Sequence, residues 1–156
     1  IGGYMAFVGY STDVYPLDMS VGLLDRTMAS SDPQSILTDL KAIKGHLPVD
    51  GNPVWIFPTD STNFTRIQTD LNIMIISAEK ITAVPTDSAA FHTGITDIRD
   101  RAEVLQENLA DAIPYMYVSF SNIIFSSIWI AALLVIFAVL NRKKQQMKEY
   151  DFSKDV

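Results

Sequence analysis

Residues 118–140 have the sequence VSFSNIIFSSIWIAALLVIFAVL, a run of 23 residues that contains no charged side chain. As an α-helix, a run of this length would measure about 35 Å, which is enough to cross a hydrocarbon layer of about 30 Å with some tilt. A helix this long in the core of a soluble protein normally carries a charged face. The sequence therefore predicts a transmembrane helix, which with its flanking residues occupies 114–141.

Basic residues next to this run predict its orientation. Arg142, Lys143 and Lys144 follow it directly, and Lys148 comes four residues later. Clusters of Lys and Arg beside a span mark the cytoplasmic side of a membrane. We therefore expect a protein of the cell membrane, with a cytoplasmic basic tail at 142–156 and with the residues before the span outside the cytoplasm.

The net negative charge of the chain lies before the tail. Residues 1–141 hold 15 acidic and 7 basic side chains, whereas the tail holds 5 basic and 3 acidic ones. An acidic domain repels phosphate backbones, so we expect no nucleic acid among its partners. The chain has no cysteine, which excludes disulfides, thiolate metal sites and cysteine nucleophiles.

The first residues form a second apolar segment. Residues 1–10 carry no charge, but they are too few to span a bilayer. We interpret residues 1–12 as the outer end of a first transmembrane helix. The remnant of a trimmed signal peptide is the alternative.

Between the two membrane segments, residues 13–113 have the pattern of four amphipathic helices. Apolar residues recur there at steps of three and four, which places them on one face of a helix. Asp32 followed by Pro33 is a typical helix start, and Gly45 is a typical helix end. Four helices in up-and-down order return the chain to the same membrane, so we expect an all-α, extracytoplasmic four-helix domain. The predicted helices are 15–29, 32–45, 61–83 and 88–112, and their inward faces are Val14, Leu17, Val21, Leu24 and Met28; Ile36, Leu37, Leu40 and Ile43; Phe64, Ile67, Leu71, Met74, Ile75 and Ile81; and Phe91, Ile95, Ile98, Ala102, Leu105 and Leu109.

Two of these helices open with the same four residues. Pro-Thr-Asp-Ser occurs at 58–61 and again at 85–88, and in both copies a phenylalanine and then a Thr-Asp pair follow at identical distances. We interpret the repeat as a reused helix start, in which Asp or Ser accepts hydrogen bonds from the first free amides. An internal duplication is the alternative.

We expect the last of the four helices to run on toward the span, with a bend near Pro114.

A loop at 46–58 interrupts the helical pattern with three prolines and an Asp-Gly-Asn turn. It contains three consecutive large apolar residues, Trp55, Ile56 and Phe57, and the up-and-down order puts it at the membrane end of the domain. We predict that these side chains pack against a partner, because large apolar side chains contribute roughly 1.5–3 kcal/mol each when buried. Closure of the base of the bundle and insertion into the outer headgroup layer are the alternatives.

Two further patterns concern partners and modification. Ser119, Asn122 and Ser126 fall on one face of the predicted span, and polar side chains in a membrane typically bond to a neighbouring helix. We predict that this face packs against another subunit, with Asn122 at its centre; hydration of Asn122 near the membrane surface is the alternative. Asn63, followed by Phe-Thr, matches the acceptor pattern for N-glycosylation.

The patterns typical of catalysis and metal binding are few. His46 and His92 are the only histidines, and neither has a second His or a Cys nearby, so each is an isolated candidate for a metal ligand. The nucleophile elbow of serine hydrolases and the glycine-rich phosphate loops do not occur in the sequence. We therefore predict that the chain is not an enzyme by itself and holds no cofactor.

The layout of short anchors, an acidic cysteine-free domain and a small basic tail resembles that of the small accessory subunits of archaeal ammonia monooxygenase, a copper-dependent membrane enzyme. The resemblance implies an archaeal accessory subunit whose partners are other membrane subunits, which would hold the catalytic copper. We accordingly expect a non-catalytic subunit that helps to assemble or stabilise a membrane complex. An extracytoplasmic ligand-binding or adaptor protein that acts through a partner is the alternative.

Overall fold

The computed structural model describes residues 2–118 and 120–152, and these residues form helices and connecting turns with no strand. The expectation of an all-α chain with a four-helix unit and one long apolar helix is confirmed for this part of the chain. The elements are α1 (Gly2–Gly9), a π-helical turn η1 (Tyr10–Val14), α2 (Tyr15–Ala29), α3 (Pro33–His46), α4 (Phe64–Ile81), α5 (Ala89–Tyr117) and α6 (Phe120–Phe152).

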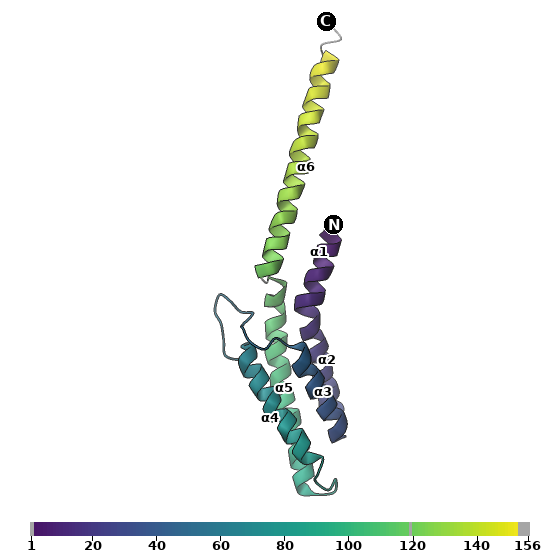
Figure 1. The fold of residues 1–156 in the computed structure, drawn as a ribbon, viewed down its shortest axis with the longest axis vertical. Helices are drawn as coiled ribbons and strands as arrows, with labels where there is room; N and C mark the ends of the chain where they lie inside the picture. The colour runs from purple at the N-terminus through teal and green to yellow at the C-terminus, as the bar shows by residue number, and fades with distance from the viewer. Residues whose placement is uncertain (1, 119, 153–156) are drawn as a thin grey trace.

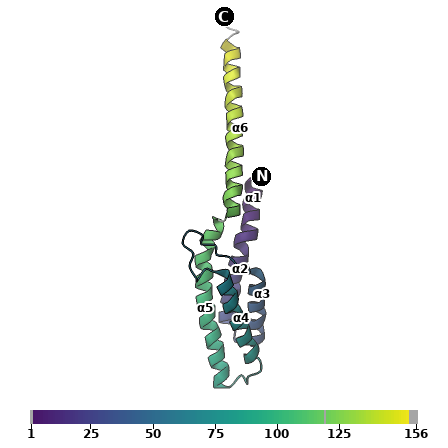
Figure 2. The ribbon, with the colours of Figure 1, turned by 60° about the vertical axis from the view of Figure 1, so that its left-hand side comes forward.

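Four of the helices form an up-and-down bundle. In it, α2 packs against α3 and α5, and α4 packs against the same two helices. Figure 1 shows α6 continuing away from the bundle in the direction in which α5 ends, and α1 extending α2 toward the same side. The view in Figure 2, turned by 60°, shows the same arrangement. Both apolar ends of the chain therefore leave the bundle from one side.

The core of the bundle consists of the apolar faces that the periodicity predicts. The predicted inward residues of α4 and α5 are all buried, and those of α2 and α3 are buried or half-buried. Two small polar residues, Ser20 and Thr27, lie on the same face of α2 and are fully buried. The hydroxyl of Ser20 donates a hydrogen bond to the carbonyl of Pro16, so its burial does not leave it without a partner.

The start of α3 confirms the predicted cap at Asp32, whereas its end differs from the predicted stop at Gly45. Asp32 is the N-cap, and its carboxylate accepts hydrogen bonds from the amides of Gln34 and Ser35. Gly45 does not end the helix, because α3 runs through it to His46. The helix ends at Leu47, whose backbone is extended with φ −83° and ψ 146°. The next residue is Pro48, and a proline disfavours the helical conformation in the residue before it.

The two Pro-Thr-Asp-Ser segments do not start their helices in the same way. In the second copy Ser88 is the N-cap of α5 and accepts a hydrogen bond from the amide of Phe91. In the first copy α4 begins only at Phe64, and its N-cap is Asn63. Ser61 instead lies 2.9 Å from the hydroxyl of Thr59. The interpretation of both copies as one capping solution is therefore wrong for residues 58–61.

The break between α5 and α6 lies beyond the proline. Pro114 is inside α5, which continues to Tyr117, and the C-cap is Val118, with φ −105° and ψ 25°. The helix therefore passes through Pro114 and ends one turn beyond it, and the bend near Pro114 stays a prediction. α6 then runs through the basic residues after the apolar stretch, so the tail begins as helix.

Candidate functional site

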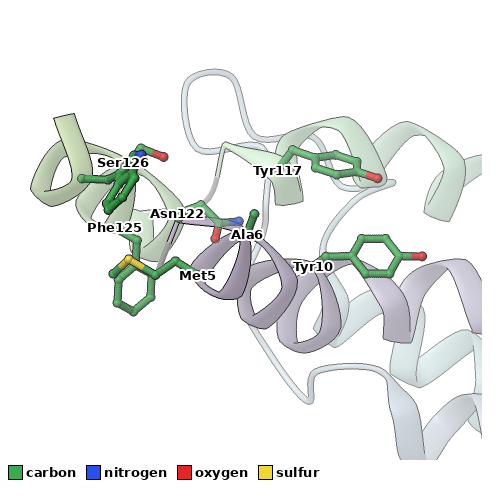
Figure 3. A pocket seen from close by; sticks show the side chains of 9 residues that line it. Met5, Ala6, Tyr10, Tyr117, Asn122, Phe125 and Ser126 are labelled. Atoms are coloured by element: carbon green, nitrogen blue, oxygen red, sulfur yellow. The ribbon is translucent and has the colours of Figure 1, made fainter. Parts of the chain in front are cut away.

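A groove lies between α1 and α6 where they leave the bundle (Figure 3). Its volume is about 390 Å³, and we call it the junction groove. Most of its lining is apolar, and its residues with polar groups include Asn122, Ser126 and the two tyrosines, Tyr10 and Tyr117. The groove is lined by Gly2, Met5, Ala6, Tyr10, Tyr117, Asn122, Phe125, Ser126 and Trp129.

Small residues of α1 allow α6 to approach closely. A Cβ atom at Gly2 would lie only 2.9 Å from the ring of Trp129. At Gly9 a Cβ atom would collide with the side-chain amide of Asn122. Gly2, Ala6 and Gly9 recur at steps of four and three, which is the spacing of one helix face. This spacing is a signal in the sequence that could have predicted the contact between the two apolar segments.

The predicted polar face of α6 contacts the chain itself. Asn122 points toward α1 in Figure 3, and its amide nitrogen donates a 3.1 Å hydrogen bond to the carbonyl of Met116 in the last turn of α5. Ser126 lines the same groove. Ser119 lies outside the described residues. Packing of this face against another subunit stays a prediction. Within the chain, Asn122 bonds to the end of α5.

The apolar loop lies at the end of the bundle where α6 begins, as the up-and-down order predicts (Figure 1). Trp55, Ile56 and Phe57 are exposed by 59%, 57% and 81%, and we call them the apolar tip. The buried residues of the loop are Leu47 and Val54, and Val54 directly precedes the tip. The alternative in which the tip closes the base of the bundle is therefore wrong, because Val54 reaches the interior and the next three side chains do not.

Asn52 holds the loop in shape. Its amide nitrogen donates to the carbonyl of Thr59 at 2.7 Å, while its oxygen accepts from the amide of Val54 at 3.0 Å and from the hydroxyl of Thr62 at 2.9 Å. Gly51 precedes it with φ +97°, a conformation that side-chain-bearing residues rarely adopt. The apolar tip is thus carried by an internally hydrogen-bonded loop.

Gln68 fixes the start of the same loop, and the sequence analysis missed it. Its side chain is buried, and its amide nitrogen lies 3.1–3.2 Å from the carbonyls of Lys44, Leu47 and Pro48. The last carbonyls of a helix have no partner within the helix, so Gln68 satisfies groups at the end of α3. The sequence contains a signal for its burial, because Gln68 stands four residues after Phe64 and three before Leu71, on the inward face of α4.

The other predicted site residues lie apart from one another. His46 is exposed at the end of α3 and His92 is exposed near the start of α5, and these helix ends are at opposite ends of the bundle (Figure 1). The two histidines therefore cannot share one metal ion. No group of three or more His, Cys, Asp or Glu that could hold a metal occurs in the described part of the chain. Asn63 caps α4 by accepting from the amide of Thr65.

A buried carboxylate joins α2 to α3. Asp39 is 1% exposed and accepts hydrogen bonds from both the Nε and an Nη atom of Arg26, whose side chain is 62% exposed. These hydrogen bonds raise the pKa of the Arg26 guanidinium above its ordinary value. The ion pair links two packed helices of the bundle, so we assign it a structural role.

Comparison with known proteins adds no family. No protein-family model, no curated protein and no solved structure matches this chain. By length and composition, one helix of the described residues could cross a membrane, and the apolar window that qualifies it is not covered by the rest of the chain.

Proposed function

We propose that the chain is a membrane-anchored, non-catalytic accessory subunit that helps to assemble or stabilise a complex of membrane proteins. In this proposal α6 crosses the cell membrane, the bundle lies outside the cytoplasm, and the basic end of α6 lies inside. Apolar side chains on all sides of α6 are exposed, among them Leu134, Val135 and Phe137. A helix with this surface is stable in a bilayer and is poorly soluble in water.

The junction groove is the observation that supports a partner in the membrane. Helices pack in membranes through small residues that allow close approach and through polar side chains that bond across the contact. The groove combines both, with Gly2 and Ala6 on α1 and Ser126 on α6. We propose that a transmembrane helix of another subunit occupies it, because such a helix offers the apolar surface and the backbone carbonyls that this lining matches.

The partner complex is a further part of the proposal. The resemblance in layout to accessory subunits of archaeal ammonia monooxygenase makes a copper-dependent membrane monooxygenase one candidate. In that case the catalytic copper would belong to other subunits. Metal analysis of the purified complex tests this part separately, since copper can be absent while the subunit role still holds.

Purification in mild detergent from native membranes tests the subunit role. We expect the tagged chain to co-purify with a constant set of membrane proteins. Ala6→Phe, which fills the junction groove, should release them. Leu134→Phe, at an exposed position of α6 outside the groove lining, is the matched control and should retain them. A lone monodisperse chain, or equal retention by both variants, would contradict the proposal.

A further inference from the structure

We propose that the apolar tip is an interfacial anchor, which inserts into the outer headgroup layer of the same bilayer that α6 crosses. The inference rests on the membrane span in the proposed function, and it assigns a lipid surface to three residues that the sequence analysis assigned to a protein partner.

The level of the tip along the helix axis is the first support. Ile56 and Phe57 line a depression of about 470 Å³ together with Asp111 and Tyr115 of α5. Tyr115 lies three positions before Val118, the C-cap of α5, which is about 4.5 Å along the helix axis at 1.5 Å per residue, and α6 begins at Phe120. The headgroup region on each side of a bilayer is roughly 5–8 Å thick. The tip therefore lies at headgroup level if the hydrocarbon layer begins near the start of α6.

Both views of the fold agree with this level. The loop lies beside the upper end of α5, close to the start of α6 (Figures 1 and 2). Tyr115 and Tyr117 are exposed in the same turn of α5. Tryptophan, tyrosine and phenylalanine are favoured at the boundary between headgroups and acyl chains, where an amphipathic ring has one apolar and one wet side. The tip and the two tyrosines together form an aromatic belt around the start of the span.

The construction of the loop is the second support. Asn52 hydrogen-bonds to three groups of the loop and Val54 is buried, so the backbone on the inner side of the tip is fixed. The three tip side chains are more than half exposed. A braced loop loses little conformational entropy when its side chains enter an apolar layer. Exposed apolar side chains on an ordered loop are thus suited to insertion.

The surroundings of the tip favour zwitterionic lipid. The flanking charged residues Asp50 and Asp60 are exposed, Asp60 forms a 3.8 Å ion pair with Arg66, and Asp111 lines the adjoining depression. Carboxylates at this level repel anionic headgroups. We therefore expect insertion to be stronger in phosphatidylcholine bilayers than in bilayers that contain an anionic lipid.

The two tryptophans allow the insertion of the tip and the membrane span of α6 to be tested separately. The chain contains Trp55 in the tip and Trp129 at the middle of the 118–140 run, and no other tryptophan. Trp129→Phe leaves Trp55 as the reporter of the tip, and Trp55→Phe leaves Trp129 as the reporter of the span. Each variant is reconstituted as the full chain in phosphatidylcholine vesicles whose acyl chains carry bromine either near the glycerol or near the chain end.

We expect opposite depth profiles. Trp55 should be quenched about twofold more by the shallow bromine than by the deep one, and Trp129 should show the reverse order, since aromatic belts lie at the interface. Quenching of Trp129 without quenching of Trp55 would overturn the anchor and leave the span intact. Quenching of neither would overturn the span, and the anchor with it. Shielding of Trp55 only in the purified complex would assign the tip to a protein partner and overturn the lipid assignment.

A second measurement does not depend on tryptophan. Phe57→Ser should reduce the quenching of Trp55 by the shallow bromine by about half, because the neighbouring aromatic ring contributes to the same insertion. Val104→Ser removes an exposed apolar side chain of α5 that lies eleven residues before Tyr115, and it should change nothing. Equal effects of the two replacements, or no effect of Phe57→Ser, would contradict the anchor.

Discussion

Gly9 of α1 lies directly against the side-chain amide of Asn122 of α6, and no methyl group fits between them. The same amide donates a hydrogen bond to the carbonyl of Met116 at the end of α5, which also accepts from the backbone amide of the C-cap Val118. The glycine therefore makes room for a side chain that satisfies the break between α5 and α6. This one contact links both apolar ends of the chain to the bundle.

Gly9→Ala should displace the Asn122 side chain and loosen the contact between α1 and α6. Interhelical polar contacts of this kind are worth about 0.6 kcal/mol on average, so we expect a lower melting temperature of the full chain in detergent, measured by circular dichroism. Gly3→Ala is the matched control, because nothing lies within 4 Å of a Cβ atom there, and it should be neutral or stabilising. Asn122→Ala should remove most of the difference between the two alanine variants. A Gly9→Ala chain as stable as Gly3→Ala would contradict the contact.

Gln68→Leu should destabilise the bundle more than a surface change does. It leaves carbonyls at the end of α3 without their buried donor, which typically costs about 1–3 kcal/mol. Gln106, whose amide bonds to Asp25 at the exposed surface, provides the control Gln106→Leu. Chemical unfolding of both variants measures the difference in the free energy of unfolding. Equal values for the two leucine variants would show that the hydrogen bonds of Gln68 do not hold the loop in solution.

Arg26→Met should lower the melting temperature by the same amount at about pH 6 and about pH 9. Asp39 raises the pKa of the Arg26 guanidinium, and a raised pKa contributes stability that is fully present below the ordinary value and is lost only as pH rises through the folded-state value. Both values lie far above neutral pH, so the contribution is constant across this range. Arg101→Met, which removes a surface pair with Asp97, is the control and should cost only about 0.3–0.5 kcal/mol. An effect of Arg26→Met that disappears between the two pH values would contradict this assignment.

A tag placed after Val156 should resist protease added to sealed right-side-out vesicles. Arg142, Lys143 and Lys144 follow the span, and basic residues favour the cytoplasmic side. Cleavage within residues 82–88, which connect α4 to α5 at the end of the bundle away from α6, serves as the internal control, since this connection should be accessible from outside. Loss of the tag while a cytoplasmic marker survives would reverse the topology.

The elements that depend on a local pattern could be predicted from the amino-acid sequence. The charge-free run at 118–140 and the inward faces of the four helices follow from composition and from steps of three and four, because each helix shows its buried side in its own residues. Asp32 could be predicted as a cap because a cap and its first amides are neighbours in the chain.

Contacts between residues that are distant in the chain depend on how the helices pack. Gly9 meets Asn122, and Gln68 meets the end of α3; the spacing of these residues indicates an inward face, but their partners follow only from helix packing. The copy of Pro-Thr-Asp-Ser at 58–61 does not cap its helix as the copy at 85–88 does, because Asn52 and the neighbouring hydroxyls bind its residues within the loop. Whether Trp55 or Val54 reaches the interior likewise depends on where the bundle leaves space. Local preferences set which segments are helical, and packing decides where those helices begin and which side chains remain exposed.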